Sequence, residues 1–572
     1  MQGKSKNRLK RFIIRFLLGF FLVALILVVY FVIIAIDHPP RVEDLTSLKT
    51  IRLHPSQNTY IYGHNWLRKS ESGLWEAYIE GKPFERGVAF GRLTKELLYY
   101  QETSFVEQIR ELVPSDAYLK VLKYFIAFFN RNLDKSITEE YRYEIYGTSF
   151  SCSPEYDFIG SGYQRQLNYH AAHDIGHALQ GLNMVGCTSF SVWKGSSADS
   201  SLLVARNFDF YMGKKFGENK IVCFVNPSSG HKFMMVTWAA LIGVVSGMND
   251  QGLTVTLNAA KSTIPYQAAT PVTLLAREIL QYASNIEEAY NISKKRKMFV
   301  SESIMIGSAR DGKTAIIEKS PDRIDLVYPD STRIICSNHF QGKVFANDEK
   351  NLENIHGSDS YSRYMRVKEL LSAHKMLNVG DMVQILRDQR GLGNKDVGMG
   401  NQLSVNQLIA HHSVVFKPDS LLAWVSAGPW QEGKFICYDL KKVFNLEISQ
   451  VKNNREIYVT SRTVPADTFL NSENYRLFRE YQTMSEQLAL FRITKQPLPP
   501  NFDAAYRKTN PSLYLTYVQL GEYYEAFGIF DQALSCYNTA LTCVLPGLDE
   551  ERKLKEKAGE LNKKIDHGVS RN

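Results

Sequence analysis

The sequence lacks the features of a disulfide scaffold and of a nucleic-acid-binding protein. Its seven cysteines are an odd number, are scattered, and include no Cys-x-x-Cys pair, which argues against a disulfide framework and a zinc ribbon. Beyond the first 36 residues, 62 basic residues face 59 acidic ones, so the chain has little of the positive charge that a nucleic-acid partner requires. Charged residues make up 22% and hydrophobic residues 44% of the 572 residues. This composition excludes wholesale disorder and a polytopic membrane protein.

The amino terminus has the pattern of a membrane anchor. Residues 1–36 hold six basic residues and no acidic one, and 16–36 form an uncharged run of 21 residues. A helix of this length spans about 30 Å, the thickness of the hydrocarbon core. Basic residues before the run and Asp37 after it predict a cytoplasmic Met1 and an extracytoplasmic remainder. The alternative is a cleaved signal peptide, which the length of the run and the lack of an A-x-A site disfavour.

Changes in residue pattern divide the rest of the chain into four segments. Residues 37–74 are expected to be a linker, and residues 75–186 to be mostly helical. Residues 187–460 alternate groups of strand-like and helical patterns, which predicts α+β layers with a mostly antiparallel sheet. Residues 461–572 form a helical region of a different texture.

The carboxyl-terminal region contains one copy of a tetratricopeptide-like pattern. Small and aromatic residues stand at the spacing of such a repeat, at Tyr517, Leu520, Gly521, Tyr524, Ala533, Tyr537 and Ala540. A stable array needs about three repeats. Two interpretations therefore stay open: a helical hairpin packed on the main domain, and a repeat that binds a protein partner.

Cys187 follows a glycine at the point where the strand-rich segment begins. One interpretation is a small hydrophobic residue in a core strand, because free cysteine is among the most buried residue types. The other is a nucleophile at a newly made amino terminus, since Gly186 permits backbone conformations that a side chain would forbid. An N-to-S acyl shift onto the thiol, followed by hydrolysis, would free the α-amine of Cys187. Such an amine has an ordinary pKa of about 7.7–8.0, which suits a base for its own thiol.

The segment around Cys187 and several later motifs resemble a known enzyme family. Residues 186–190 and 206–210 resemble the N-terminal nucleophile (Ntn) hydrolases of the penicillin acyltransferase type, whose members are similar to acyl-CoA:6-aminopenicillanic acid acyltransferase. They are also similar, more distantly, to the choloylglycine hydrolases. Further matches follow in the same order at 247–253, 336–339 and 360–364. The likeness covers about residues 75–440 and implies an αββα Ntn-hydrolase sandwich, with the amino-terminal helix and the carboxyl-terminal region outside it.

The resemblance also implies roles for individual residues around the nucleophile. Cys187 would attack an amide or thioester carbonyl and carry the acyl group. Asp209 would hold or position the freed ammonium, and Arg206 would lower the thiol pKa and orient the acyl carbonyl. From the residues alone, Arg206 and Asp209 are also consistent with an ion pair on the surface of a strand.

Three further residues would complete the site. By the resemblance, Asn258 would donate its side-chain amide to the tetrahedral oxyanion, and Asn338 and Arg363 would complete the polar network. Without the resemblance, Asn258 could be a strand-end asparagine and Arg363 an exposed helix residue.

Three histidines just before Cys187 suggest a competing site. His170, His173 and His177 stand at i, i+3 and i+7 with Asp174 beside them, and His-x-x-x-His is a metal-ligand spacing. However, aspartate stands where the zinc-protease signature has glutamate. The alternative is a polar helix end near the cleavage point, and we predict no bound metal and no cofactor.

These inferences predict a membrane-anchored enzyme whose catalytic part lies on the extracytoplasmic side. It would be an Ntn cysteine amidohydrolase or acyltransferase, matured by self-cleavage between Gly186 and Cys187. A small-molecule N-acyl amide would react through a thioester acyl-enzyme, the membrane would be bound through residues 16–36, and no nucleic acid would bind. The alternative is an inert Ntn-fold scaffold that recruits a protein partner through its carboxyl-terminal helices.

Overall fold

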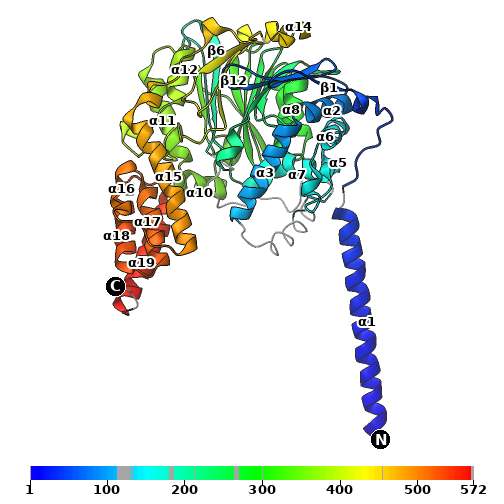
Figure 1. Cartoon of the computed structure of the whole chain (residues 1–572), viewed down its shortest axis with the longest axis vertical. Coiled ribbons are helices and arrows are strands. Elements are labelled where there is room, and N and C mark those ends of the chain that lie inside the picture. Colours follow the sequence, from blue (N-terminus) through cyan, green and yellow to red (C-terminus); the bar gives the residue numbers. More distant parts are fainter. Residues whose placement is uncertain are drawn as a thin grey trace.

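A computed structural model describes residues 2–35, 37–112, 126, 130–131, 133–178, 186–210, 213–262, 269–298, 300–453 and 455–568. Within these ranges, an isolated amino-terminal helix, a body with two β-sheets and a carboxyl-terminal group of helices are visible (Figure 1). The chain is therefore a mixed α/β protein with a separate helical region at its carboxyl end.

The amino-terminal helix α1 (Gln2–Ala35) projects away from the body as a single rod (Figure 1). Its segment Phe12–Tyr30 has a mean hydropathy of 3.0, and none of it is buried against the rest of the chain. The helix is long and apolar enough to cross a membrane, a criterion that a signal sequence near an amino terminus also meets.

In the described part of the chain, the larger sheet has eleven strands and joins segments from both sides of Cys187. Its order is β1 (Arg52–Ser56), β2 (Thr59–Tyr62), β3 (Asn65–Lys69), β4 (Trp75–Gly81), β7 (Ile221–Pro227), β8 (Phe233–Thr237), β9 (Ser246–Asn249), β10 (Leu253–Ala259), β11 (Glu302–Ser308), β12 (Lys313–Lys319) and β13 (Ile324–Val327). Neighbouring strands are antiparallel except β4 and β7, which pair in parallel from Trp75–Ile221 to Gly81–Pro227. Strands from before and after the predicted cleavage point therefore belong to one continuous sheet.

The prediction of a linker over residues 37–74 is wrong for residues 52–69. These residues form β1, β2 and β3 and extend the larger sheet. Ile61, Trp66 and Leu67 are buried at 2% exposure or less. Short polar stretches interrupt the strand pattern in the sequence of this segment. Its strands depend on pairing and burial against distant residues more than on local propensity.

The smaller sheet carries Cys187 at the start of one of its inner strands. Its six antiparallel strands are ordered β14 (Arg333–Cys336), β5 (Thr188–Lys194), β6 (Ser200–Phe208), β15 (His412–Lys417), β16 (Leu422–Ser426) and β17 (Phe435–Asp439). One face of this sheet packs on the larger sheet through a shared apolar layer that includes Val204, Val414, Phe224 and Val236. Cys187 directly precedes β5, which lies between β14 and β6.

Helices cover the outer face of each sheet. The larger sheet is covered by helices that include α2 (Pro83–Leu93), α6 (Glu139–Ser149), α7 (Gly162–Ala178), α8 (Val272–Tyr282) and α9 (Ile286–Lys295). The smaller sheet is covered by α11 (Ser360–Ala373) and α12 (Val379–Leu386). The layers thus run helix, sheet, sheet, helix, the order that the family resemblance implied. The described part of the body also contains the α-helices α3 (Lys95–Leu112), α5 (Leu133–Ser136), α10 (Glu349–Gly357), α13 (Leu440–Val443) and α14 (Ile448–Lys452).

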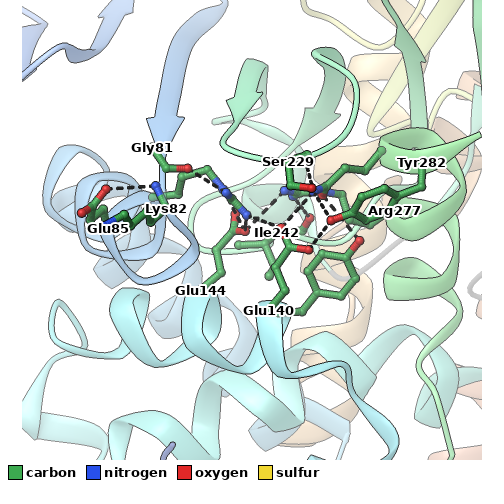
Figure 2. A network of polar contacts seen from close by, with 12 residues as sticks. Gly81, Lys82, Glu85, Glu140, Glu144, Ser229, Ile242, Arg277 and Tyr282 are labelled. Carbon is green, nitrogen blue, oxygen red and sulfur yellow. Dashed lines mark hydrogen bonds and ion pairs between the residues drawn. The ribbon is translucent and has the colours of Figure 1, made fainter. Parts of the chain in front are cut away.

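A buried ionic network joins the segments before and after Cys187 (Figure 2). Glu144 on α6 accepts hydrogen bonds from Arg86 of α2 at 2.7 Å and from Arg277 of α8 at 3.3 Å. Glu140, one turn earlier, accepts from Arg86 at 2.9 Å, from Gln281 at 2.9 Å and from the hydroxyl of Tyr282 at 2.6 Å. We call these residues the clamp, since they hold α2 and α6 against α8.

The carboxyl-terminal helices form a core of their own. They are α15 (Glu473–Thr494), α16 (Phe502–Thr509), α17 (Tyr514–Ala526), α18 (Phe530–Thr542) and α19 (Leu548–Asp566). The predicted helical hairpin is present as α17 and α18, where Gly521 lies so close to Tyr537 that a Cβ atom would come within 2.6 Å of its ring. Leu408 of the body belongs to the same core, so this region is packed on the main domain. Partner binding by the hairpin stays a prediction.

Candidate active site

Arg206 donates a hydrogen bond to the thiol of Cys187. The two strands β5 and β6 pair Ser189 with Arg206, which places the guanidinium beside the thiol, with Nη2 3.4 Å from Sγ. Arg206 also donates to the carbonyls of Val245, at 2.5 Å, and of Leu257. It is fully buried, so the alternative of a surface ion pair is wrong for this residue.

Burial favours the protonated form of the Cys187 thiol in the uncut chain. Its side chain is 1% exposed, and burial raises its pKa above the ordinary value although Arg206 opposes the rise. The carboxyl groups of Asp209 and Glu302 act in the same direction as burial. The sulfur is therefore an unreactive thiol in this state, and a base is needed to activate it.

Asp209 is a buried carboxyl group that lacks hydrogen-bond partners among the described residues. It follows β6, is fully buried, and neither of its carboxylate oxygens has a partner there. Burial raises its pKa to about 7, although Arg363 and Arg206 lower it. Its backbone carbonyl accepts a hydrogen bond from the Gly186 amide at 3.0 Å. Buried polar groups are normally paired, so an unpaired carboxylate with a pKa near neutrality is a candidate for a functional position.

Arg363 and Asn338 lie on the other side of Cys187. Arg363, on α11, donates to the Cys187 carbonyl at 2.7 Å and to the Thr188 hydroxyl at 2.9 Å. It also donates to the side-chain carbonyl of Asn338 at 2.8 Å, and Asn338 donates to the Ala259 carbonyl at 3.0 Å. Arg363 is 1% exposed, so the alternative of an exposed helix position is wrong.

Asn258 is brought to the site, and both ends of its side-chain amide make hydrogen bonds in the uncut chain. It is the last residue but one of β10 and faces β5 across the interior of the sandwich. Its side-chain carbonyl accepts from Ser189 at 2.7 Å, and its amide donates to the Cys336 carbonyl at 3.2 Å. The Cys336 carbonyl takes one of the two N–H groups of this amide, which leaves the other for an oxyanion.

Three contacts at the site were missed by sequence reasoning. Gln407 donates to the Gly186 carbonyl at 2.9 Å. His412 contacts the Ser246 hydroxyl at 2.8 Å, and this hydroxyl accepts from Arg206. Gln407 lies in the irregular loop before β15, and no motif or periodicity there points to a site 221 residues earlier.

An apolar pocket lies next to this group of residues. It has about 560 Å³ of empty space, its mouth included, and its walls include Phe105, Tyr169, Phe210, Phe216 and Trp238. The Phe208 ring, which packs on Arg206 at 4.4 Å, stacks on Phe210 with ring centres 5.7 Å apart. Cys187 is not among the described residues that line the pocket, so its sulfur is covered in the uncut chain.

His170 has a structural role in the described part of the chain. Its Nδ1 contacts the Gln166 carbonyl at 2.7 Å, and its Nε2 accepts from the Ile242 amide at 3.0 Å, which occupies both nitrogens. Asp174 accepts from the Val272 amide at the start of α8. The side chains of His173 and His177 lie outside the described residues. Among the described side chains, no three His, Cys, Asp or Glu gather in a way that could hold a metal ion.

Two curated proteins are similar to part of the chain. An uncharacterized protein of Archaeoglobus fulgidus is 26% identical over 275 residues, which cover 45% of this chain and 46% of that protein. Protein dcd1B of Dictyostelium discoideum is 23% identical over 278 residues, or 45% of this chain and 52% of that protein. The chain thus spans about half the length of the curated relatives it matches.

Two solved structures also match parts of the chain. A Caenorhabditis elegans ortholog of N-acylethanolamine-hydrolyzing acid amidase matches with a TM-score of 0.30 and 17% identity, over 41% of this chain and 93% of that one. A mutant of the conjugated bile acid hydrolase from Clostridium perfringens matches with a TM-score of 0.32 and 13% identity, over 45% of this chain and 93% of that one.

The family comparison covers the strand-rich segment. The matching model spans residues 193–404, which include Arg206, Asp209, Asn258, Asn338 and Arg363 but begin six residues after Cys187. The likeness inferred from the motifs is thus confirmed, and residues 193–404 match the family described as acyl-coenzyme A:6-aminopenicillanic acid acyl-transferase.

Proposed function

We propose that this protein is an Ntn cysteine amidohydrolase or acyltransferase that matures by cutting itself between Gly186 and Cys187. The observation that carries the proposal is the unpaired carboxylate of Asp209, buried beside a thiol that Arg206 contacts. A buried carboxylate without a partner costs free energy, and the ammonium freed at Cys187 would supply the missing partner. The family match over residues 193–404 supports the same chemistry.

Catalysis would follow from the new amino terminus. The α-amine of Cys187 takes the proton of its own thiol, and the sulfur attacks the substrate carbonyl. Asn258 donates an N–H of its side-chain amide to the oxyanion, while Arg206 and Asp209 hold the thiolate and the ammonium. The amine of the substrate leaves with the proton, and a thioester remains on Cys187. Water then yields a carboxylic acid, whereas an acceptor amine yields a new amide.

The surroundings of the site favour a linear amide with an apolar acyl group. The aromatic walls of the pocket, including Phe210, Phe216 and Trp238, suit a hydrocarbon chain better than a charged one. With α1 as a membrane anchor and the body on the extracytoplasmic side, acyl-coenzyme A is scarce. We therefore place hydrolysis of an N-acyl amide before acyl transfer.

Cleavage would leave chains of 186 and 386 residues, and only the first would carry the anchor. The parallel pairing of β4 with β7 and the clamp would hold the second chain on the first. The mature catalytic chain would thus stay at the membrane without a covalent tether.

The second candidate function is an inert scaffold whose carboxyl-terminal helices recruit a protein. It is favoured by the burial of Cys187, which is 1% exposed in the uncut chain. In the proposed enzyme the sulfur becomes accessible once the residues before it have been cut and have moved.

The mass of the purified full-length protein distinguishes the two functions. We expect two chains from the wild type and one from Cys187→Ala. The wild type should then release free amine from members of a panel of N-acyl amino acids, bile-salt conjugates and β-lactams, and Cys187→Ala should release none. A wild type that stays one chain and releases no amine would establish the scaffold.

A further inference from the structure

The loop that carries Gln407 connects the predicted cleavage point to the carboxyl-terminal helices. We propose that Gln407 stabilises the oxyanion formed during self-cleavage, and that the carboxyl-terminal helical region is the element that positions it. This inference rests on the proposed self-cleavage and gives the helical region a role within the chain.

Gln407 contacts the atom on which negative charge would develop. Its Nε2 donates to the Gly186 carbonyl oxygen at 2.9 Å, and its side chain is 3% exposed. The amide also lies directly against the Gly186 Cα, where a Cβ atom would come within 2.7 Å of Oε1. Glycine at position 186 is therefore required for this approach, independently of the chemistry at Cys187.

The other amide and guanidinium donors of the site are directed elsewhere. Asn258 donates to the Cys336 carbonyl and Asn338 to the Ala259 carbonyl. Arg363 donates to the carbonyl of Cys187, one residue after the scissile bond. Of the described side chains, Gln407 is the one that donates to the Gly186 oxygen.

The proposed step is an N-to-S acyl shift followed by hydrolysis. The Cys187 sulfur bonds to the Gly186 carbonyl carbon, its proton passes to Asp209, and the carbonyl π electrons move to the oxygen held by Gln407. The carbon–nitrogen bond then breaks, and the Cys187 nitrogen takes the proton from Asp209. Water adds to the thioester, the carbon–sulfur bond breaks, and the products are the Gly186 carboxylic acid and the free thiol.

The carboxyl-terminal helices hold the loop of Gln407 at both ends. At the start of the loop, Asn510 accepts from the Met399 amide at 3.1 Å and donates to the Met399 carbonyl at 2.8 Å. Gly398 has a φ of +83°, and a Cβ atom there would come within 2.5 Å of the Leu513 amide nitrogen. At the far end, Leu408, the neighbour of Gln407, is fully buried in the core of the helices.

The same region therefore fixes the backbone on each side of the amide donor. An oxyanion donor acts only when it is held in place before the charge develops, because reorientation during the reaction would cost free energy. We infer that the helical region pre-organises the self-cleavage site.

The first test compares the rates of self-cleavage in full-length variants. Gln407→Met keeps the size of the side chain and removes the donor, so the rate should fall about 100-fold or more. Gln407→Glu should be slower still at pH 8, because a carboxylate beside the Gly186 oxygen repels the developing charge. The matched control is Gln431→Met, which removes another buried amide that donates to a backbone carbonyl, that of Leu386. It should cleave within about threefold of the wild type.

Rates of Gln407→Met within threefold of the wild type would overturn the inference while leaving the proposed function in place. A wild type that does not cleave would overturn both. Thermal unfolding of each variant, measured in the Cys187→Ala background, separates a lost donor from a lost fold.

The second test concerns the helical region. Asn510→Ala removes both bonds to Met399 and should slow cleavage about tenfold, the effect expected for a displaced donor. Leu561→Ala, in the same helical core on α19, weakens the region without touching the loop. If Leu561→Ala slows cleavage as much as Asn510→Ala at equal loss of stability, the positioning role is refuted.

Discussion

The clamp and the Cys187 site are both buried clusters of arginines and carboxylates, but they differ in how their charges are paired. In the clamp, Glu144 lies between Arg86 and Arg277 (Figure 2). Each buried polar side-chain atom of the clamp has a hydrogen-bond partner among the described residues. In the site, Arg206 Nε and both carboxylate oxygens of Asp209 have none among the described residues. Saturated pairing is expected of a structural network, and unpaired charges of a reactive one.

The pKa of Arg86 in the clamp and that of Asp209 in the site are both raised, but by different causes. Burial lowers the pKa of Arg86, but Glu144 and Glu140 raise it above the ordinary value. At Asp209, burial outweighs the two arginines and raises the pKa to about 7. Arg86 thus stays charged over the physiological range, whereas the site holds a group that can exchange a proton within it.

The largest effect should come from breaking the clamp. Glu144→Ala leaves two buried guanidinium groups without their shared partner, which should cost about 3–5 kcal/mol of unfolding free energy. Urea unfolding of the Cys187→Ala chain, with and without Glu144→Ala, measures this loss. If the loss of unfolding free energy were as small as that expected for an exposed ion pair, the clamp would not be a stabilising network.

A change at Asn258 should affect turnover more than assembly. Asn258→Ala removes the expected oxyanion donor of the mature enzyme and should lower kcat about 10²–10³-fold, with KM less affected. The protein should still appear as two chains, because Gln407 serves the cleavage step. Loss of cleavage together with turnover would indicate that a single oxyanion donor serves both steps.

The unpaired carboxylate should make self-cleavage depend on pH. If Asp209, with a pKa of about 7 raised by burial, takes the thiol proton, the rate should be about tenfold lower at pH 6 than on its plateau above pH 8. The raised pKa of Asp209 also makes the stability of the folded chain depend on pH. Stability falls as the pH rises, whereas the cleavage rate increases. The folded chain binds a proton that the unfolded chain has lost, so this group destabilises the Cys187→Ala chain as pH rises from about 4 to 7.

Asp209→Asn separates these two effects. It should slow cleavage at every pH and remove the stability slope. The uncut Cys187→Ala chain should therefore resist thermal unfolding at pH 8 better when it also carries Asp209→Asn than when the aspartate is kept. A pH profile of cleavage that is the same in the Asp209→Asn variant would assign the base to another group.

The smallest effect should come from an exposed pair of the same chemistry. Arg476 and Glu473 on α15 are 2.5 Å apart and more than 60% exposed. Glu473→Ala should therefore change neither the thermal unfolding temperature nor the cleavage rate measurably. A large fall in the unfolding temperature would show that exposed ion pairs also stabilise this protein, so the clamp would not differ from them.

Much of the architecture follows from local sequence patterns. The uncharged run 16–36 predicts the long apolar helix, and the small residue Gly521 opposite Tyr537 predicts the hairpin of α17 and α18. The motifs around 206–210 and 247–253 predict the family that residues 193–404 match. These predictions depend only on the length of an apolar run, on side-chain size and on short motifs, all of which are visible in the sequence.

Other features were decided only by the tertiary structure. The strands within residues 52–69 exist because β4 joins them to β7, and Gln407 reaches Gly186 across 221 residues. Whether Asp209 is paired, and therefore whether its pKa lies near 4 or near 7, depends on which distant segments cover it. The sequence by itself determined the membrane-length helix, the carboxyl-terminal hairpin and the family motifs. Folding determined the reactive groups, because desolvation and hydrogen bonding are properties of the neighbours that a side chain meets in space.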